Sequence, residues 1–191
     1  MIRNMVCAVL IVLCLLAIYF GSYLPYNKAR RYIAAVGLLG GARRITLPEF
    51  QSELGAVFAY YSPVGQQEVA RFSGNTVLDL MNRARFPEEV SRSLVDFLTP
   101  LMTGNDVREL LAVAYLYEYE WRTYHREGDF RKAEAYYQRI HAIAPRMPHG
   151  LYSLLGMYEA QGDEGKAREM TLAILGLWPK DERMRFLLEN R

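Results

Sequence analysis

The fold is decided by the stretch EGDFRKA at residues 127–133, which is matched 34 residues later by QGDEGKA at residues 161–167. The same offset relates Tyr124 to Tyr158. A repeat of this length lies in the range of helical arrays, in which each unit buries an apolar face on its neighbour. Because such arrays usually bind other macromolecules, the repeat favours a binding protein over an enzyme.

The remaining sequence is also helical in character. Thr46 and Glu49 form a capping-box pattern that opens a helix reaching about Tyr60. Further helices are expected at about 66–83, 86–98, 105–127, 129–144, 148–161, 163–178 and 181–189. No segment shows sustained period-two alternation, so the sequence predicts an all-α protein.

The two repeat units place the same residue types at matching positions. The first unit supplies Trp121, Tyr124, Gly128, Ala133, Tyr137 and Pro145, and the second supplies Leu154, Leu155, Tyr158, Gly162, Ala167 and Pro179. These residues resemble the tetratricopeptide repeat (TPR) family over about residues 112–188. The resemblance implies an α-solenoid of helix-turn-helix units, in which Gly turns the chain, Ala lets helices approach closely and Pro ends the second helix. The units depart from the pattern at Glu120, Trp121 and Thr171.

Four parts are expected along the chain. They are an anchor at 1–26, a basic juxtamembrane segment at 27–45, a helical region at 46–104, and two TPR-like repeats (about 114–147 and 148–181) with a capping helix within 105–191. Two repeats are fewer than the three or so that a solenoid needs. We therefore expect the 46–104 region to cover the first repeat, and the last helix, through Phe186, Leu187 and Leu188, to cover the second.

The anchor is an uncharged stretch of 20 residues from Met5 to Leu24, long enough as a helix to span about 30 Å of hydrocarbon. Tyr19, Tyr23 and Tyr26 gather at its end, where interfacial aromatic residues are common. A cleaved signal peptide is the alternative, but no small-residue cleavage site follows the apolar stretch. The segment after it is either a short interfacial helix or a continuation of the first.

Charge is distributed unevenly. Residues 1–50 carry six Lys and Arg against one acidic residue, and residues 51–191 carry 17 against 20. A basic stripe on the folded part is therefore missing, which argues against nucleic acid as a partner. Five cations follow the span at Lys28, Arg30, Arg31, Arg43 and Arg44. The positive-inside bias then favours a cytoplasmic body, although a lone signal anchor can send the body outside.

Few side chains suggest chemistry. Cys7 and Cys14 both lie in the apolar segment, and His125, His141 and His149 lack metal-site spacing. No Gly-rich phosphate loop or nucleophile elbow is present. The sequence thus predicts a protein that is not an enzyme and that holds no metal or cofactor.

The inner surface of a TPR array is lined mainly by the first helix of each pair. The register assigns to this partner-binding groove Tyr115, Glu118, Arg122, Arg126, His149, Tyr152 and Glu159. Arg122 and Arg126 stand four residues apart and could jointly hold a partner's carboxylate. The alternative is that both are solvated or paired with Glu118.

A second resemblance concerns the order of a membrane helix, a basic stretch, the segment FAYYSPVGQQEV at 58–69 and then the repeats. This order looks like the C-terminal tail of bacterial O-antigen ligase/polymerase-type membrane proteins. We therefore expect a single-pass protein of a bacterial inner membrane that binds a peptide or a membrane-complex subunit in envelope or glycan assembly. The alternative is a truncated or accessory tail of such an enzyme. The oligomeric state is left open.

Overall fold

The computed structural model describes residues 2–40, 45–102, 104 and 106–189. Within these ranges every regular element is a helix, as the sequence predicts. The elements are α1 (Ile2–Ile18), the π-helical turn η1 (Tyr19–Tyr23), α2 (Leu24–Gly37), η2 (Leu38–Gly40), α3 (Leu47–Ala59), α4 (Gln66–Ala84), α5 (Glu88–Leu98), η3 (Thr99–Leu101), α6 (Val107–Tyr124), α7 (Glu127–Ile143), α8 (Pro148–Gln161), α9 (Glu164–Leu177) and α10 (Glu182–Glu189).

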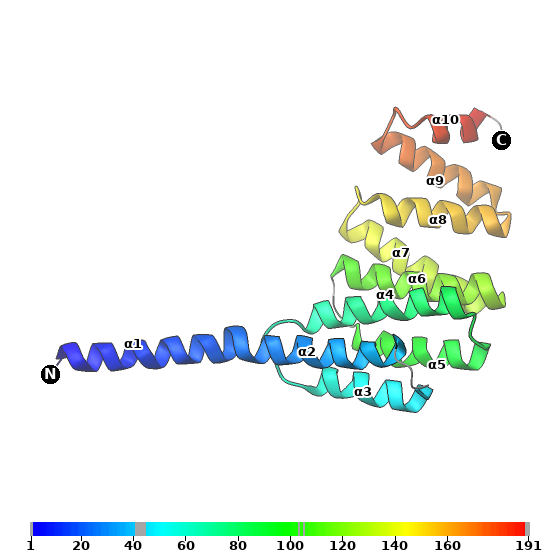
Figure 1. Cartoon of the computed structure of the whole chain (residues 1–191). Helices are drawn as coiled ribbons and strands as arrows, with labels where there is room; N and C mark the ends of the chain where they lie inside the picture. Colours follow the sequence, from blue (N-terminus) through cyan, green and yellow to red (C-terminus); the bar gives the residue numbers. More distant parts are fainter. Residues whose placement is uncertain (1, 41–44, 103, 105, 190–191) are drawn as a thin grey trace.

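A long helical rod forms the N-terminal part of the molecule. α1, η1 and α2 follow one another without a break, and α1 projects away from the other helices (Figure 1). Every side chain from Asn4 to Tyr23 is exposed. By length and composition the helix Asn4–Gly37 is apolar enough to cross a membrane. We call this continuous helix the rod.

The second half of the rod belongs to the folded body. Leu24, Lys28 and Ala35 of α2 are buried, and α2 contacts both α3 and α4. The segment 27–45, expected to be a separate juxtamembrane stretch, is thus continuous with the first helix and integrated into the body over its described part. A hinge between the apolar segment and the body is absent from the described rod, because one helix runs through both.

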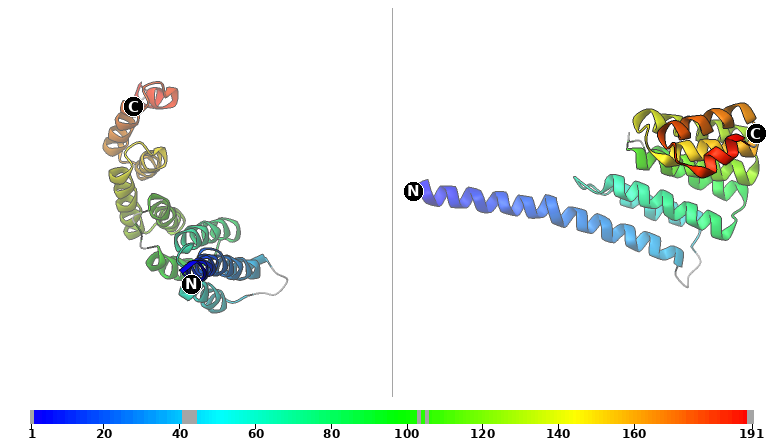
Figure 2. Two further views of the ribbon diagram at one scale, coloured as in Figure 1. Left: turned by 90° about the vertical axis from the view of Figure 1, so that its left-hand side faces the viewer. Right: turned by 90° about the horizontal axis from the view of Figure 1, so that it is seen from above.

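The body is a row of antiparallel helix pairs. The pairs α2/α3, α4/α5, α6/α7 and α8/α9 stack in chain order, and α10 closes the row (Figure 1). Seen along the rod, α4, α6, α8 and α10 lie in one layer and α5, α7 and α9 in the other (Figure 2). One continuous apolar core runs through the pairs from Phe50 to Met184. α4 and α5 therefore supply the cover that the first repeat needs.

The turns of the row lie at two opposite edges. The turns at 60–65, 144–147 and 178–181 lie on the side from which α1 projects (Figure 1). The turns at 85–87, 125–126 and 162–163 lie on the far side. We call these the proximal edge and the distal edge.

Local signals explain most of the helix ends. The Thr46 hydroxyl accepts from the Glu49 backbone while the Glu49 carboxylate accepts from the Thr46 backbone, which confirms the predicted capping box. α4 runs unbroken through Ser73-Gly74-Asn75, three residue types that are poor helix formers. A Cβ at Gly74 would lie 2.7 Å from Met102 Cε and 3.2 Å from Ala112 Cβ, so this glycine permits close contact between α4 and α6.

One expected role is wrong. Gly128 does not turn the chain between α6 and α7, because it lies in the first turn of α7. The left-handed residue there is His125, with φ of 56°, a conformation in which His is enriched among non-glycine residues. In the second unit Gly162 does occupy the turn, with φ of 77°. The two turns are therefore built from positions three residues apart in the repeat register.

The other repeat positions lie where helices meet or end. Ala133 and Ala167 are buried, Tyr158 is buried, and the Tyr124 hydroxyl donates to the Phe86 carbonyl at 2.7 Å. Pro145 and Pro179 each lie two residues after the last residue of α7 and α9, in the proximal turns. In α10 Leu187 packs against the core, as expected, but the fully buried side chain is Met184 and Phe186 is exposed. The expected element ends at 105 and 190–191 lie outside the described residues.

Candidate binding surface

The predicted groove residues of α6 lie against α7 and α8. Tyr115 packs edge-on against Tyr137 at a centroid distance of 6.0 Å. The Glu118 carboxylate accepts a hydrogen bond from the Tyr137 hydroxyl. The pKa of Tyr137 is raised, mainly by burial and in addition by the negative charge of Glu118. Ser153 of α8 lies within reach of both tyrosine hydroxyls. Tyr115 and Glu118 thus make most of their contacts with other side chains of the body, mainly Tyr137 and Arg122.

The two arginines are held by different carboxylates. Arg122 Nε donates to Glu118 at 2.8 Å, and Arg122 extends toward α8, 3.7 Å from where a Cβ on Gly156 would lie. Arg126 Nη1 donates to Glu88 at 2.9 Å at the distal edge. The structure shows the pairing with Glu118 and does not bring both guanidinium groups onto one shared site. Arg122 therefore lies between α6 and α8 and keeps its pairing with Glu118.

The groove residues of α8 are spread along the helix. His149 is exposed in the first turn, at the proximal edge, and Glu159 is exposed near the end, at the distal edge. Ten residues of helix separate them by about 15 Å, so they do not share a site. Tyr152 lies between them and is half-buried, in a pocket that the sequence analysis did not anticipate.

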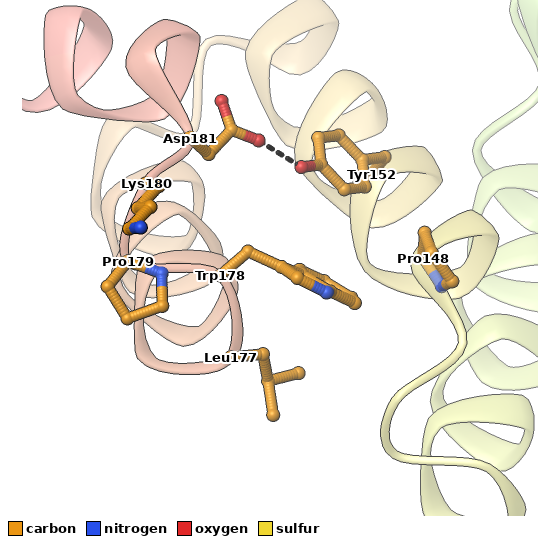
Figure 3. A pocket seen from close by; sticks show the side chains of 7 residues that line it. All are labelled: Pro148, Tyr152, Leu177, Trp178, Pro179, Lys180 and Asp181. Atoms are coloured by element: carbon orange, nitrogen blue, oxygen red, sulfur yellow. Dashed lines mark hydrogen bonds between the residues drawn. The ribbon is translucent and has the colours of Figure 1, made fainter.

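This terminal pocket lies where α8, α9 and the turn before α10 meet (Figure 3). Its volume is about 650 Å³, and it is lined by Pro148, Tyr152, Leu177, Trp178, Pro179, Lys180 and Asp181. The Trp178 indole extends toward α8, and its ring lies 6.1 Å from that of Tyr152. The walls are therefore apolar and aromatic, and the exposed Lys180 supplies a cation at the rim.

Hydrogen bonds hold one wall of the terminal pocket in place. The Tyr152 hydroxyl donates to Asp181 (Figure 3), and the Met184 backbone N–H donates to the other oxygen of that carboxylate at 3.1 Å. Burial and the Asp181 bond raise the pKa of Tyr152 to about 12, and the Tyr152 bond lowers the pKa of Asp181. Because both Asp181 oxygens are used, the pocket is suited to an apolar group beside an anion rather than to a cation.

Sequence reasoning missed this pocket although a signal was present. Trp178 and Lys180 flank Pro179, which was interpreted only as a helix stop. A tryptophan in a turn is a large apolar side chain with little local helix to cover it. Only the placement of α8 across the turn shows that Tyr152 and Pro148 form the opposite wall.

The basic stretch after the apolar segment is partly buried in the body and does not form a separate juxtamembrane segment. Lys28 is buried, donates to the Tyr60 carbonyl at 2.8 Å and also contacts Gln66, and burial lowers its pKa. Arg31 lies over the Tyr60 ring at 4.6 Å, and Arg30 is exposed. Arg43 and Arg44 lie outside the described residues. Lys28 is thus a buried side chain that links α2 to the turn between α3 and α4 by hydrogen bonds, and it is not a surface cation.

A buried polar cluster joins α5 to the first repeat. Arg92 Nη1 donates to both Asp129 oxygens at 2.8 and 2.9 Å and lies 3.9 Å from Glu120, which accepts from the Ser91 hydroxyl. Glu120 and Asp129 are 0% and 1% exposed, and burial raises the pKa of Glu120. The cluster explains why a carboxylate replaces the apolar residue of the repeat pattern: it completes a bridge between helices and has no open face for a ligand.

Comparison with known proteins adds no family. The chain matches none of the protein-family models, and none of the curated proteins matches it. Among the residues that the structure describes, no group of three His, Cys, Asp or Glu side chains is placed to hold a metal ion. The rod, the stacked helix pairs and the terminal pocket are the features of this chain that bear on function.

Proposed function

We propose that this chain is a single-pass membrane protein whose TPR-like α-solenoid binds a protein partner beside the membrane. The observation that carries the proposal is the division of one continuous helix into two environments. Its first half is apolar and exposed throughout, and its second half is packed into the helical body. Exposed apolar surface on this scale is costly in water and is relieved by a bilayer.

The helical body supports the binding part of the proposal. Stacked helix pairs with a 34-residue sequence match, buried Ala133 and Ala167 at matching positions and a closing helix are features of a TPR array. The terminal pocket has the size and apolar lining of a ligand site. We propose that it receives an apolar side chain of the partner, followed by a carboxylate that pairs with Lys180.

The membrane and the process are part of the same proposal. The exposed cations Arg30 and Arg31 favour a cytoplasmic body by the positive-inside bias, at a bacterial inner membrane. A reporter enzyme fused after Arg191 decides this: activity that requires a cytoplasmic location supports the orientation, and periplasmic activity contradicts it. Envelope or glycan assembly is the proposed process.

The test of binding uses the full-length protein, because a fragment lacking α2 would expose the surfaces of α3 and α4 that Lys28 and Ala35 cover. The tagged chain is expressed, crosslinked in intact cells and purified in detergent, and the captured proteins are identified. Trp178→Ala should remove a specific partner, whereas Leu172→Ala, at an exposed position of α9 outside the pocket, should retain it. Equal capture by both variants contradicts the assignment of the pocket. Capture of a polytopic glycan polymerase or ligase would favour the accessory-tail alternative.

A further inference from the structure

The turn between α3 and α4, at residues 60–65, presents apolar side chains to the outside. Tyr61 is 68% exposed and Val64 is 57% exposed, with the exposed Pro63 between them. The Ser62 hydroxyl donates to the Val64 carbonyl at 2.6 Å, which holds the turn in one conformation. A preformed turn with an outward aromatic ring and an aliphatic side chain suits insertion into an apolar or interfacial environment.

The structure also fixes the height of this turn along the rod. Lys28 of the rod donates to the Tyr60 carbonyl, and its Cδ lies 4.0 Å from where a Cβ on Gly65 would be. Lys28 stands four residues, or about 6 Å of helix, beyond Leu24, where the apolar segment ends. Both views place the turn on the side of the body from which α1 projects (Figures 1 and 2).

We propose that the turn at 60–65 is a second membrane contact, with Tyr61 and Val64 entering the headgroup region of the bilayer that α1 spans. This inference rests on the proposed function, because it needs α1 in the membrane. Tyr61 would join the interfacial tyrosines Tyr19, Tyr23 and Tyr26 of the rod. The exposed Arg30 and Arg31 lie at the same level and attract anionic headgroups.

A bilayer fits this surface better than a protein partner does. The rod leaves no flexible linker between the span and the turn, so α1 in the membrane brings the turn to the interface automatically. The combination of tyrosine, an aliphatic residue and neighbouring arginines matches the composition of a membrane interface. Two contacts would orient the row of helix pairs, so that the proximal edge, including the terminal pocket, faces the membrane.

The experiment measures depth with a fluorescent label. The full-length protein, with Cys7→Ala and Cys14→Ala, carries Val64→Cys or Glu89→Cys and a nitrobenzoxadiazole dye. Glu89 is exposed at the distal edge and controls for attraction of the dye itself to lipid. A third protein, with only Cys7→Ala, is labelled at the native Cys14 in α1. Each is reconstituted into phosphatidylcholine–phosphatidylglycerol vesicles containing lipids spin-labelled near the headgroup or near the chain centre.

The three labels separate the two claims. The Cys14 dye should be quenched by chain-centre labels, and the Val64 dye by headgroup-proximal labels at least about twofold more than the Glu89 dye. Val64 quenching no greater than that of Glu89, with Cys14 quenched, overturns the second contact alone. An unquenched Cys14 dye overturns the membrane anchor and with it this inference. Headgroup-proximal quenching of the Val64 dye should be stronger in vesicles with phosphatidylglycerol than in vesicles of phosphatidylcholine alone. Loss of this difference in Arg30→Gln would support the role of the arginines.

Discussion

Two junctions between neighbouring helix pairs are built from different chemistry. Where α5 meets the first repeat, the half-buried Arg92 lies against the buried carboxylates of Glu120 and Asp129. Where α7 meets α8, it centres on apolar contact, with Gly150 so close to α7 that a Cβ would lie 3.3 Å from Ile140 Cγ2. The apolar junction joins two repeat units, and the polar junction joins a repeat unit to a helix pair outside the sequence match.

The difference shows how far a repeat pattern reaches. Units of the same sequence pattern can stack through the same apolar contact each time, because every unit has one apolar face that fits the unit before it and one that fits the unit after it. The pair before the first repeat shares the continuous apolar core through α4 and α6, and it adds an ion cluster where α5 meets α6 and α7. Buried ion pairs add little stability compared with apolar packing, but they penalise any arrangement that leaves one charge unpaired. The polar junction should therefore be more sensitive to loss of a single partner.

The largest expected effect comes from breaking the polar junction. Arg92→Met removes the guanidinium that donates to both oxygens of the buried Asp129, leaves only Arg126 at 3.6 Å, and should lower the free energy of unfolding by about 2–3 kcal/mol. Lys166→Met removes the exposed ion pair with Glu134 at the apolar junction and should cost less than about 1 kcal/mol. Urea unfolding of the full-length protein in detergent, followed by circular dichroism, measures both. Equal losses would show that the buried cluster is no more sensitive than a surface pair.

The next effect comes from filling the close contact at the apolar junction. Gly150→Val places methyl groups against Ile140 and should destabilise the protein by about 1–3 kcal/mol. Gly176→Val is the matched control, because nothing lies within 4 Å of a Cβ at that position in α9. Its stability should stay within about 0.5 kcal/mol of the parent. A neutral Gly150→Val would mean that the α7–α8 contact relaxes freely, contrary to its close packing.

A smaller effect should separate the two glycines of the sequence match. Gly162→Ala places a Cβ on a residue with φ of 77° and should destabilise by about 1 kcal/mol. Gly128→Ala lies in the first turn of α7 with open space around it and should be neutral or stabilise by up to about 1 kcal/mol. Thermal melts of the two variants suffice. If both variants were destabilised, Gly128 would also occupy a turn that requires glycine, as the sequence pattern predicted.

These comparisons also show what could be derived from the sequence. Helix positions followed from apolar spacing and from local caps such as Thr46, because both act within one turn of chain. The 34-residue match located the paired Ala133 and Ala167. It assigned the turn in the first unit to Gly128, because left-handed residues other than glycine, such as His125, leave a weaker trace in sequence.

The candidate site was harder to derive, because its walls come from separate elements. The sequence left open whether Arg122 and Arg126 share a ligand or are solvated or paired with Glu118. Arg122 pairs with Glu118, whereas Arg126 pairs with Glu88, which lies 38 residues away. The terminal pocket needs Tyr152 opposite Trp178, a contact set by the stacking of α8 on the final turn. Side-chain periodicity identifies a face of one helix and does not report which distant carboxylate or ring meets it.

The smallest effect concerns the pH dependence of the polar junction. Burial raises the pKa of Glu120 in the folded state above its ordinary value of 4.5, so the folded protein holds this proton more tightly than the unfolded chain does. The resulting stabilisation is complete below pH 4.5 and is lost as the pH rises through the folded pKa. Glu120→Gln removes this titration, so the variant should gain on the parent as the pH rises from 4.5 through the folded pKa. The gain should be small, because Ser91 and Arg92 offset part of the burial penalty. Urea unfolding of both proteins across this range measures it, and a stability difference that does not change with pH would show that Glu120 titrates alike in the folded and unfolded states.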